Sequence, residues 1–188
     1  MNQQYLFKEE ANIPGLKYIP NYIRVEYENE LIELIDTNNW NLDLKRRTQH
    51  YGYKYDYTAR SIDPSYYLGE MPHWIDELCN KLCSDSIFIE KPDQVIINEY
   101  KPGQGIAPHV DCVPCFGGVI CSLSLASGCV MSLTNGDAEK SLYLEPRSLL
   151  ILKSDSRYKW KHGIAARKSD NGVRRGRRIS LTFRKVIL

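Results

Sequence analysis

The chain has 188 residues, of which 43% are hydrophobic and 26% are charged. This length predicts a single domain, residues 1–188, that buries about 70% of its unfolded surface and needs no disulfide or structural metal for stability. The formal charge of +2 and the pI of about 8.1 are too small to indicate a polyanion-binding protein by themselves.

The amino-terminal sequence predicts neither secretion nor membrane insertion. Its first residues, MNQQYLFKEE, lack a basic segment followed by an apolar core, so no secretory signal is expected. No stretch approaches the run of about 20 apolar residues that spans a bilayer. We therefore expect an intracellular, cytoplasmic protein without membrane contact, or a nuclear one if the source is eukaryotic.

The six cysteines are expected to be free thiols, because intracellular compartments are reducing. Cys112 and Cys115 form a lone C-x-x-C sequence, for which a zinc or redox role is the alternative to ordinary loop thiols. No second cysteine pair at zinc-finger spacing supports that alternative.

Helical patterns fill the first half of the chain and strand patterns fill the second. Apolar residues have helical spacing in 24–36, and Pro72 opens a second helical segment in which Trp74, Leu78 and Leu82 recur every four residues. Six segments then have the character of short strands: 94–100, 118–126, 129–133, 141–144, 148–152 and 178–186. Helices followed by many short strands predict an α+β fold, in which helices back a sheet sandwich or jelly roll.

Side-chain alternation predicts polar groups on one face of several strands. Residues two apart on a strand point the same way, so Asn98 and Tyr100 share a face in 94–100. In 178–186 the residues of one face are Arg178, Ser180, Thr182 and Arg184. These faces can line a common cavity while the apolar faces pack.

His109, Asp111 and His162 are candidate ligands of a redox metal. Two imidazoles and one carboxylate on one side of Fe(II) form the facial triad of non-heme iron oxygenases, which leaves positions open for a co-substrate and O2. An H-x-D sequence alone is weak evidence, because a lone histidine is more often structural. The later histidine and the arginine-bearing strand provide the stronger evidence, whereas His50 and His73 are expected to be surface or packing residues.

The arginines of 178–186 predict a dicarboxylate co-substrate. 2-Oxoglutarate would bind the metal through its keto oxygen and one carboxylate. Its far carboxylate then needs a bidentate and permanently charged partner, which arginine supplies better than lysine.

Three segments, NEYKPGQGIAPHVD, WKHGIAAR and RRISLTFRKV, resemble the AlkB family of Fe(II)- and 2-oxoglutarate-dependent dioxygenases over at least residues 94–188. The resemblance implies that His109, Asp111 and His162 bind iron. The residues that it implies for 2-oxoglutarate are Asn98, Tyr100, Arg178, Ser180 and Arg184. Arg178 would hold one carboxylate with Asn98 and Tyr100, and Arg184 would help to hold the other end.

The family fold is a double-stranded β-helix, or jelly roll, with a variable substrate lid. By this resemblance residues 94–188 form the catalytic core, and residues 1–93 form the backing helices and a lid hairpin. The candidate lid is 46–60, RRTQHYGYKYDYTAR, in which tyrosines alternate with other residues and could stack on a flipped base. The alternative is that these tyrosines form the packed face of the hairpin. The substrate-binding residues expected here are Arg46, Arg47, Tyr51, Tyr53 and Tyr55, with Tyr57 continuing the pattern.

A second basic segment adjoins the proposed site. Against the single acid Asp170, residues 161–178 hold Lys161, Arg167, Lys168, Arg174, Arg175, Arg177 and Arg178. With Lys45, Arg46 and Arg47, these side chains would follow the phosphates of a nucleic acid, or else form a solvated surface.

The expected function is the oxidation of alkylated or modified nucleobases in DNA or RNA, by dealkylation as in DNA repair or by hydroxylation, with Fe(II), 2-oxoglutarate and O2. Two positions depart from the family pattern: Ser180 stands where an Asn is usual, and Val113 stands where the bacterial repair enzyme has an acid facing the alkylated base. The serine variant and YGYKYDY resemble the branch that hydroxylates a modified wobble uridine in tRNA. A protein-directed oxygenase and a noncatalytic binding module with a vestigial pocket are the alternatives, and a monomer is expected.

Overall fold

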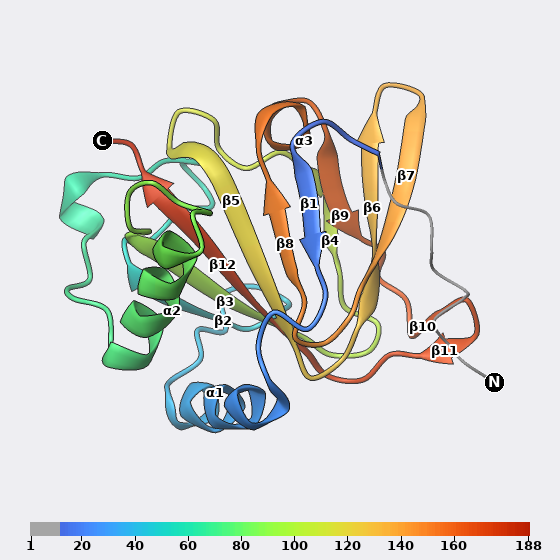
Figure 1. The fold of residues 1–188 in the computed structure, drawn as a ribbon, viewed down its shortest axis with the longest axis horizontal. Helices are drawn as coiled ribbons and strands as arrows, with labels where there is room; N and C mark the ends of the chain where they lie inside the picture. The colour runs from blue at the N-terminus through green and yellow to red at the C-terminus, as the bar shows by residue number, and fades with distance from the viewer. Residues whose placement is uncertain (1–11) are drawn as a thin grey trace.

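Strand β12 (Arg178–Val186) lies at the centre of the larger of two antiparallel sheets (Figure 1). It pairs with β3 (Gln94–Tyr100) on one side and with β5 (Phe116–Leu125) on the other. The bounds of β3 and β12 coincide with the predicted segments, because both carry continuous strand-forming residues between clear turn signals. The computed structural model describes residues 12–188 of the chain.

The larger sheet has six strands and the smaller has four. In spatial order the larger comprises β1 (Leu16–Ile19), β8 (Leu149–Leu152), β5, β12, β3 and β2 (Thr48–Gly52). The smaller comprises β4 (Ile106–His109), β9 (Lys161–Ile164), β6 (Cys129–Asn135) and β7 (Ala138–Leu144). A short hairpin of β10 (Ser169–Asp170) and β11 (Val173–Arg174) stands apart, and a 3₁₀ turn spans Pro64–Tyr66. This is the jelly-roll architecture that the sequence predicted.

Helices α1 (Val25–Thr37) and α2 (His73–Ser84) pack on the outer face of the larger sheet (Figure 1). Both were predicted from their apolar spacing. The apolar stripe of each helix meets the strand residues that point outward, and one core forms from both sets. Its fully buried members include Leu31, Ile35, Ile75, Ile97, Leu123, Ile179 and Leu181.

A second core fills the space between the two sheets. It combines inward residues of the larger sheet, such as Ile120 and Leu150, with Leu133 and Ile164 of the smaller sheet. Because side chains alternate along β12, Ile179, Leu181 and Phe183 join the helix core while the even-numbered polar residues face this inner space. The inner space is therefore lined by both apolar and polar side chains.

The amino-terminal half contributes more than helices and a lid, which corrects the predicted division at residue 93. β1 pairs with β8 at one edge of the larger sheet, and β2 pairs with β3 at the other. The expected lid hairpin is also shorter than predicted, because after Gly52 only isolated bridges such as Tyr53–Tyr67 remain. Gly52 has φ +73°, a left-handed conformation that ends the strand.

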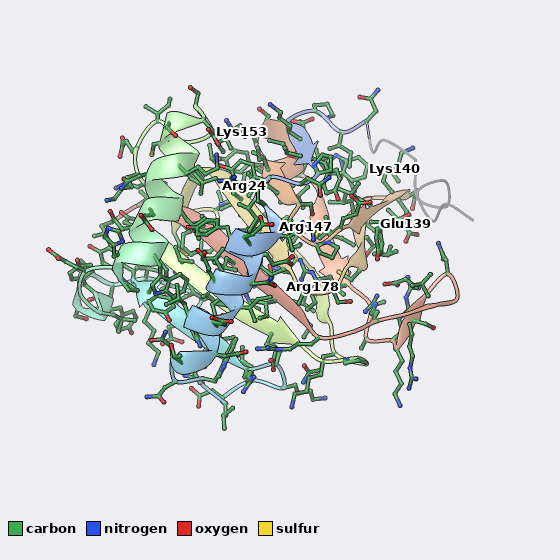
Figure 2. The ribbon with its side chains drawn as sticks, turned by 60° about the horizontal axis from the view of Figure 1, so that its bottom comes forward. Arg24, Glu139, Lys140, Arg147, Lys153 and Arg178 are labelled. Atoms are coloured by element: carbon green, nitrogen blue, oxygen red, sulfur yellow. A yellow bond between two sulfur atoms is a disulfide. The ribbon has the colours of Figure 1, made fainter. Side chains whose placement is uncertain are left out.

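Ion pairs attach the helical layer to the sheet. Arg147, which stands beside α1 in Figure 2, donates to the buried Glu28 of that helix at 3.0 Å. Glu99 of β3 is 1% exposed and accepts from both Arg47 and Arg177, and Arg177 also binds Asp36 of α1. A buried carboxylate with two guanidinium partners resists separation, since loss of either partner leaves an uncompensated charge.

None of the helices in residues 12–188 is long and apolar enough to span a membrane. The amino-terminal sequence in which no secretory signal is expected lies outside the described residues.

We expect Ile97→Ala to destabilise the protein strongly. Ile97 is 0% exposed in the helix core, so removing its side chain leaves a cavity that costs about 2–5 kcal/mol of unfolding free energy. Ile89 is 103% exposed, and Ile89→Ala should change stability by less than about 0.5 kcal/mol. Urea unfolding of both variants checks the contrast, and equal midpoints would contradict the assigned core.

Candidate active site

Strands β4 and β9 bring two imidazoles together. His109 and His162 are direct partners in the antiparallel register, and their ring centroids lie 4.5 Å apart. His109 Nδ1 lies 2.9 Å from the carbonyl oxygen of Ala107. Because a carbonyl only accepts, Nδ1 carries the proton and Nε2 is left with a free lone pair.

Asp111 faces these imidazoles from the segment that follows β4. Its Oδ1 accepts a hydrogen bond of 2.8 Å from Arg184 Nη2. Its Oδ2 is buried without a hydrogen-bond partner in the described part of the chain and lies 3.8 Å from His162 Nε2. One ligand atom from each of His109, Asp111 and His162 lies within 4.8 Å of the others. An unpartnered buried carboxylate oxygen beside two imidazole nitrogens fits a divalent cation.

The protonation states of these groups also suit a metal. Burial alone would raise the pKa of Asp111, but the Arg184 guanidinium and the two imidazoles outweigh it and hold that pKa below its usual range. Burial lowers the pKa of His162 to about 4, although the Asp111 charge acts in the opposite direction. Near neutral pH the site therefore offers a charged carboxylate and a neutral imidazole, the forms that bind metals.

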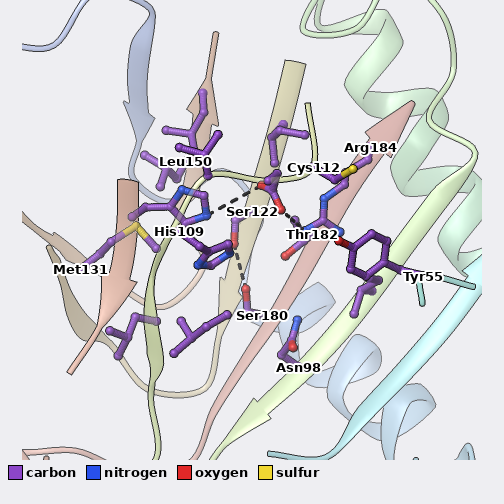
Figure 3. Close-up of a pocket in the computed structure, with 18 of the residues that line it drawn as sticks. Tyr55, Asn98, His109, Cys112, Ser122, Met131, Leu150, Ser180, Thr182 and Arg184 are labelled. Atoms are coloured by element: carbon purple, nitrogen blue, oxygen red, sulfur yellow. Dashed lines mark hydrogen bonds and ion pairs between the residues drawn. The ribbon is translucent and has the colours of Figure 1, made fainter. Parts of the chain in front are cut away.

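These three residues lie in the wall of a cavity of about 390 Å³ between the two sheets. Figure 3 shows His109, Asn98, Ser180, Arg184 and Tyr55 directed toward this space, with Ser180 and Arg184 both on β12. Apolar side chains form another part of its wall, among them Ile120, Met131, Leu150 and Leu152. The volume is within the range of small-molecule sites in proteins.

Arg178 places an unsatisfied guanidinium in the cavity. It is 3% exposed, and its Nη2 donates to Ser124 Oγ at 2.8 Å. Its Nε and Nη1 are buried without partners among residues 12–188. The ring of Tyr100 lies 5.5 Å from the guanidinium carbon. A buried cation with two idle donors needs an anion, and a carboxylate matches its geometry.

All five residues predicted to bind 2-oxoglutarate line the cavity. The pairing of β12 with β3 sets Arg178 beside Tyr100 and Ser180 beside Asn98. The Ser180 hydroxyl shares a 2.8 Å hydrogen bond with Ser122 of β5, drawn as a dashed line in Figure 3. A diacid that reaches from Arg178 toward Asp111 and Arg184 would therefore lie along the polar face of β12.

The residues predicted to bind substrate are divided by the structure. Arg46 and Tyr55 line the cavity, whereas Arg47, Tyr51 and Tyr53 do not. The Arg47 guanidinium lies over the Trp40 ring at 4.4 Å and binds Glu99 on the helix side of the sheet. The structure thus corrects the expectation for these three residues.

The reason for this division is the alternation of β2. Thr48 and His50 face inward, so Gln49 and Tyr51 point to the helices, where Tyr51 packs edge-on against Trp74 at 5.8 Å. Tyr53 follows the break at Gly52 and contacts Tyr67 at 5.1 Å. The predicted single aromatic face does not form, because the strand ends at Gly52.

Two further lid residues line the cavity, Tyr57 and Arg60. Tyr57 continued the predicted tyrosine pattern, but Arg60 carried no signal beyond its place at the end of the lid segment. His50 packs edge-on against Tyr57 at 5.9 Å, and the His73 side chain is 86% exposed, as expected for packing and surface residues.

The cysteines depart from expectation at one pair. Cys112 and Cys115 form a disulfide, because the turn between them brings their Cα atoms to 5.3 Å, within disulfide range. The other four cysteines are free thiols, as predicted. Cys112 also lines the cavity, directly after the Asp111 carboxylate.

The sequence of the chain matches a known protein family over most of its length. The model of the 2OG-Fe(II) oxygenase superfamily matches residues 15–184. The chain belongs to this superfamily. It is an Fe(II)- and 2-oxoglutarate-dependent dioxygenase of the AlkB type, as the sequence resemblance predicted.

Individual relatives match most of this chain. The chain is 39% identical to the uncharacterized protein L905 of Acanthamoeba polyphaga mimivirus, over all of this chain (100%) and 92% of that one. It is 37% identical to the alkylated DNA repair protein ALKBH8 homolog of Arabidopsis thaliana and 36% identical to the mouse tRNA (carboxymethyluridine(34)-5-O)-methyltransferase ALKBH8. These matches include 96% and 94% of this chain, but the chain spans only 61% and 31% of those two proteins.

Two solved structures share the fold. OsALKBH1 superposes with a TM-score of 0.73 at 18% identity, over 92% of this chain and 97% of that one. A Pseudomonas putida prolyl-4-hydroxylase superposes with a TM-score of 0.61 at 16% identity, over 91% and 92% of the two chains.

Superfamily membership assigns the groups that the cavity would hold. When bound, Fe(II), 2-oxoglutarate and O2 supply an oxidative decarboxylation that is coupled to oxygen insertion into a substrate C–H bond. We expect His109, Asp111 and His162 to hold the metal, because their donor atoms converge and one is unpartnered. We expect Arg178 to hold the far carboxylate of the diacid beside the buried Tyr100 ring.

Arg178→Lys should raise the KM for 2-oxoglutarate. Lysine keeps the positive charge but cannot make the two parallel hydrogen bonds of a guanidinium group. The loss of one hydrogen bond to a charged group costs about 1.5–3 kcal/mol. The expected rise is about 10- to 100-fold, measured as succinate formation over a range of 2-oxoglutarate concentrations. Arg24→Lys, at an exposed position before α1, is the matched control. An unchanged KM in Arg178→Lys would remove this residue from the co-substrate site.

Proposed function

We propose that the protein oxidises modified or alkylated nucleobases within nucleic acid. The observation that carries this proposal is the aromatic and basic mouth of the cavity, which adjoins the metal ligands. Tyr55, Tyr57, Arg46 and Arg60 stand there together. A flat, partly charged substrate group such as a flipped nucleotide matches this combination.

The two lid tyrosines supply a stacking surface. Their ring centroids lie 5.1 Å apart in an edge-on arrangement, and Tyr55 is braced against Phe116 at 5.8 Å. Tyr57 is 39% exposed, so its ring borders both the cavity and solvent. Aromatic rings at such a position hold bases with little dependence on base identity.

Exposed basic side chains also gather around the turn at 102–104. Gln104 links the turn to the carbonyl oxygen of Lys45 at 2.6 Å, and the Gly103 amide donates to the carbonyl oxygen of Arg167. The exposed basic residues in this region are Lys45, Lys101, Lys168 and Arg174. The neighbouring Arg167 and Arg175 are instead bound to Asp170, so only part of the predicted basic segment remains available to phosphates.

The names of the relatives support the same substrate class. Besides the ALKBH8 proteins, a DNA N6-methyl adenine demethylase of Caenorhabditis elegans is 32% identical over 92% of this chain. The ALKBH8 likeness favours a narrower form of the proposal, in which the substrate is a modified wobble uridine of tRNA and the product is a stable alcohol. An N-alkyl substrate would instead yield a hydroxylated group that collapses to an aldehyde and the free base.

Mass spectrometry of nucleosides distinguishes these forms. Bulk tRNA, an N-methylated DNA oligonucleotide and a proline-containing peptide are each incubated with protein, Fe(II), 2-oxoglutarate and O2, and succinate is measured alongside. We expect substrate-dependent succinate with a gain of 16 mass units, as expected for one oxygen atom, on a tRNA nucleoside, or loss of methyl from the oligonucleotide. His109→Ala is the inactive control. Stimulation by the peptide alone, with both nucleic acids unchanged, would overturn the proposal.

Tyr57→Ala should weaken nucleic-acid binding while leaving 2-oxoglutarate binding intact. Stacking on one aromatic ring contributes about 1–3 kcal/mol, so the KM for the nucleic acid should rise by about tenfold or more. Tyr67→Ala is the matched control, because Tyr67 is an exposed tyrosine that follows the lid segment and lies outside the cavity lining. If Tyr57→Ala had the same KM as Tyr67→Ala and the wild type, Tyr57 would not contact the base.

A further inference from the structure

Arg157 is a buried arginine without an acidic partner in hydrogen-bonding distance. It lies on the short helix α3 (Ser154–Tyr158), between β8 and β9, and is 2% exposed. Arginine is almost never buried this completely unless it is paired. Among residues 12–188 none of its hydrogen bonds goes to a carboxylate, so its donors are satisfied in another way.

Backbone carbonyl groups take the place of the missing acid. Arg157 makes four hydrogen bonds to one short segment: Nη1 to Asp111 O at 3.0 Å, Nη2 to Cys112 O at 3.2 Å, Nη2 to Phe116 O at 3.3 Å, and Nε to Gly117 O at 3.3 Å. The planar fork of a guanidinium can serve four acceptors at once, whereas an ammonium group cannot match this geometry. We call residues 111–117 the ligand loop, because the segment begins at Asp111.

The ligand loop has little regular structure of its own. Residues 110–115 lie between β4 and β5 outside any strand, and the loop is cross-linked by the Cys112–Cys115 disulfide. Carbonyl groups in such a segment need partners when they are buried. Arg157 supplies them, and charge-assisted hydrogen bonds are stronger than neutral ones.

The position of Arg157 in the chain gives this contact its importance. The connection that carries Arg157 leads directly into β9, on which His162 lies. Arg157 therefore ties the segment that bears one imidazole to the loop that bears the carboxylate. Arg184 holds the Asp111 side chain from the larger sheet at the same time.

We propose that Arg157 is a positioning residue for the metal centre, which sets the separation of Asp111 and His162 by clamping the ligand loop to the β8–β9 connection. The inference rests on these residues being the metal ligands and does not depend on the nucleic-acid substrate. Arg157 touches neither metal nor co-substrate in this role. Its effect passes through the backbone of the ligand loop.

Metal affinity tests the clamp without catalysis. Mn(II) is titrated calorimetrically into wild type, Arg157→Lys and Arg157→Met at a temperature well below their unfolding. Loss of a group that orients a ligand typically weakens metal binding about 10- to 100-fold, and we expect this for both variants. The lysine variant keeps the positive charge, so a loss of Mn(II) affinity in Arg157→Lys would show that the guanidinium fork is required. Wild-type Mn(II) affinity in both variants would overturn the proposal.

Arg175→Lys is the matched control. Arg175 is also buried, at 8% exposure, and donates to the Ala165 carbonyl oxygen as well as to Asp170, away from the ligand loop. We expect this variant to lower the unfolding temperature but to keep the wild-type Mn(II) affinity. If it lost as much affinity as Arg157→Lys, the effect would be one of general stability and the proposal would fail.

Two further measurements separate positioning from folding. Turnover of 2-oxoglutarate by Arg157→Lys should recover as the Fe(II) concentration is raised, because the variant is defective only in its affinity for the metal. The absence of recovery would argue against the clamp. If neither Arg157 variant folds, hydrogen exchange of the wild type decides the question. The amides of 111–117 and of 154–158 should then open as one unit, and independent opening would overturn the proposal.

Discussion

The active site depends on one buried ion pair that joins the two sheets. Arg184 lies on β12 of the larger sheet, and Asp111 follows β4 of the smaller one, with 2.8 Å between Nη2 and Oδ1. A buried pair contributes little net stability, because desolvation offsets most of the attraction. Its effect here is geometric: one carboxylate oxygen is occupied by Arg184, and the other is left to face the imidazoles. The orientation of the ligand set therefore follows from the packing of one sheet against the other.

Two pairs of adjacent arginines divide between two tasks. Arg46 and Arg178 face the cavity, while their neighbours Arg47 and Arg177 point to the helix side and share Glu99. Because each pair is adjacent in sequence, the same buried carboxylate anchors both segments that carry the inward arginines. Arg46 and Arg178 are therefore each next in sequence to an arginine fixed by Glu99. The Glu99 ion pairs lie on the helix side of the sheet, away from the cavity.

The site divides into a rigid part and a variable part. The proposed metal and co-substrate residues lie on or directly after strands of the two sheets, where register fixes them relative to one another. The proposed substrate contacts, Tyr55, Tyr57 and Arg60, lie in the irregular segment after Gly52. Loops on a rigid scaffold can change their contacts without disturbing the chemistry below them. This arrangement explains how one reaction type can be combined with different substrates.

The sequence by itself determined the strands with strong periodicity, the candidate ligands and the polar face of β12, because alternation along a strand is a local property that residue types record. Only the tertiary structure decided which lid tyrosines reach the cavity, since Gly52 ends the strand that would have placed them on one face. It also decided the Cys112–Cys115 disulfide, the strands β1 and β2, and the burial of Arg157. Each of these depends on contacts between segments far apart in the chain, and such contacts leave no pattern in any single stretch of sequence.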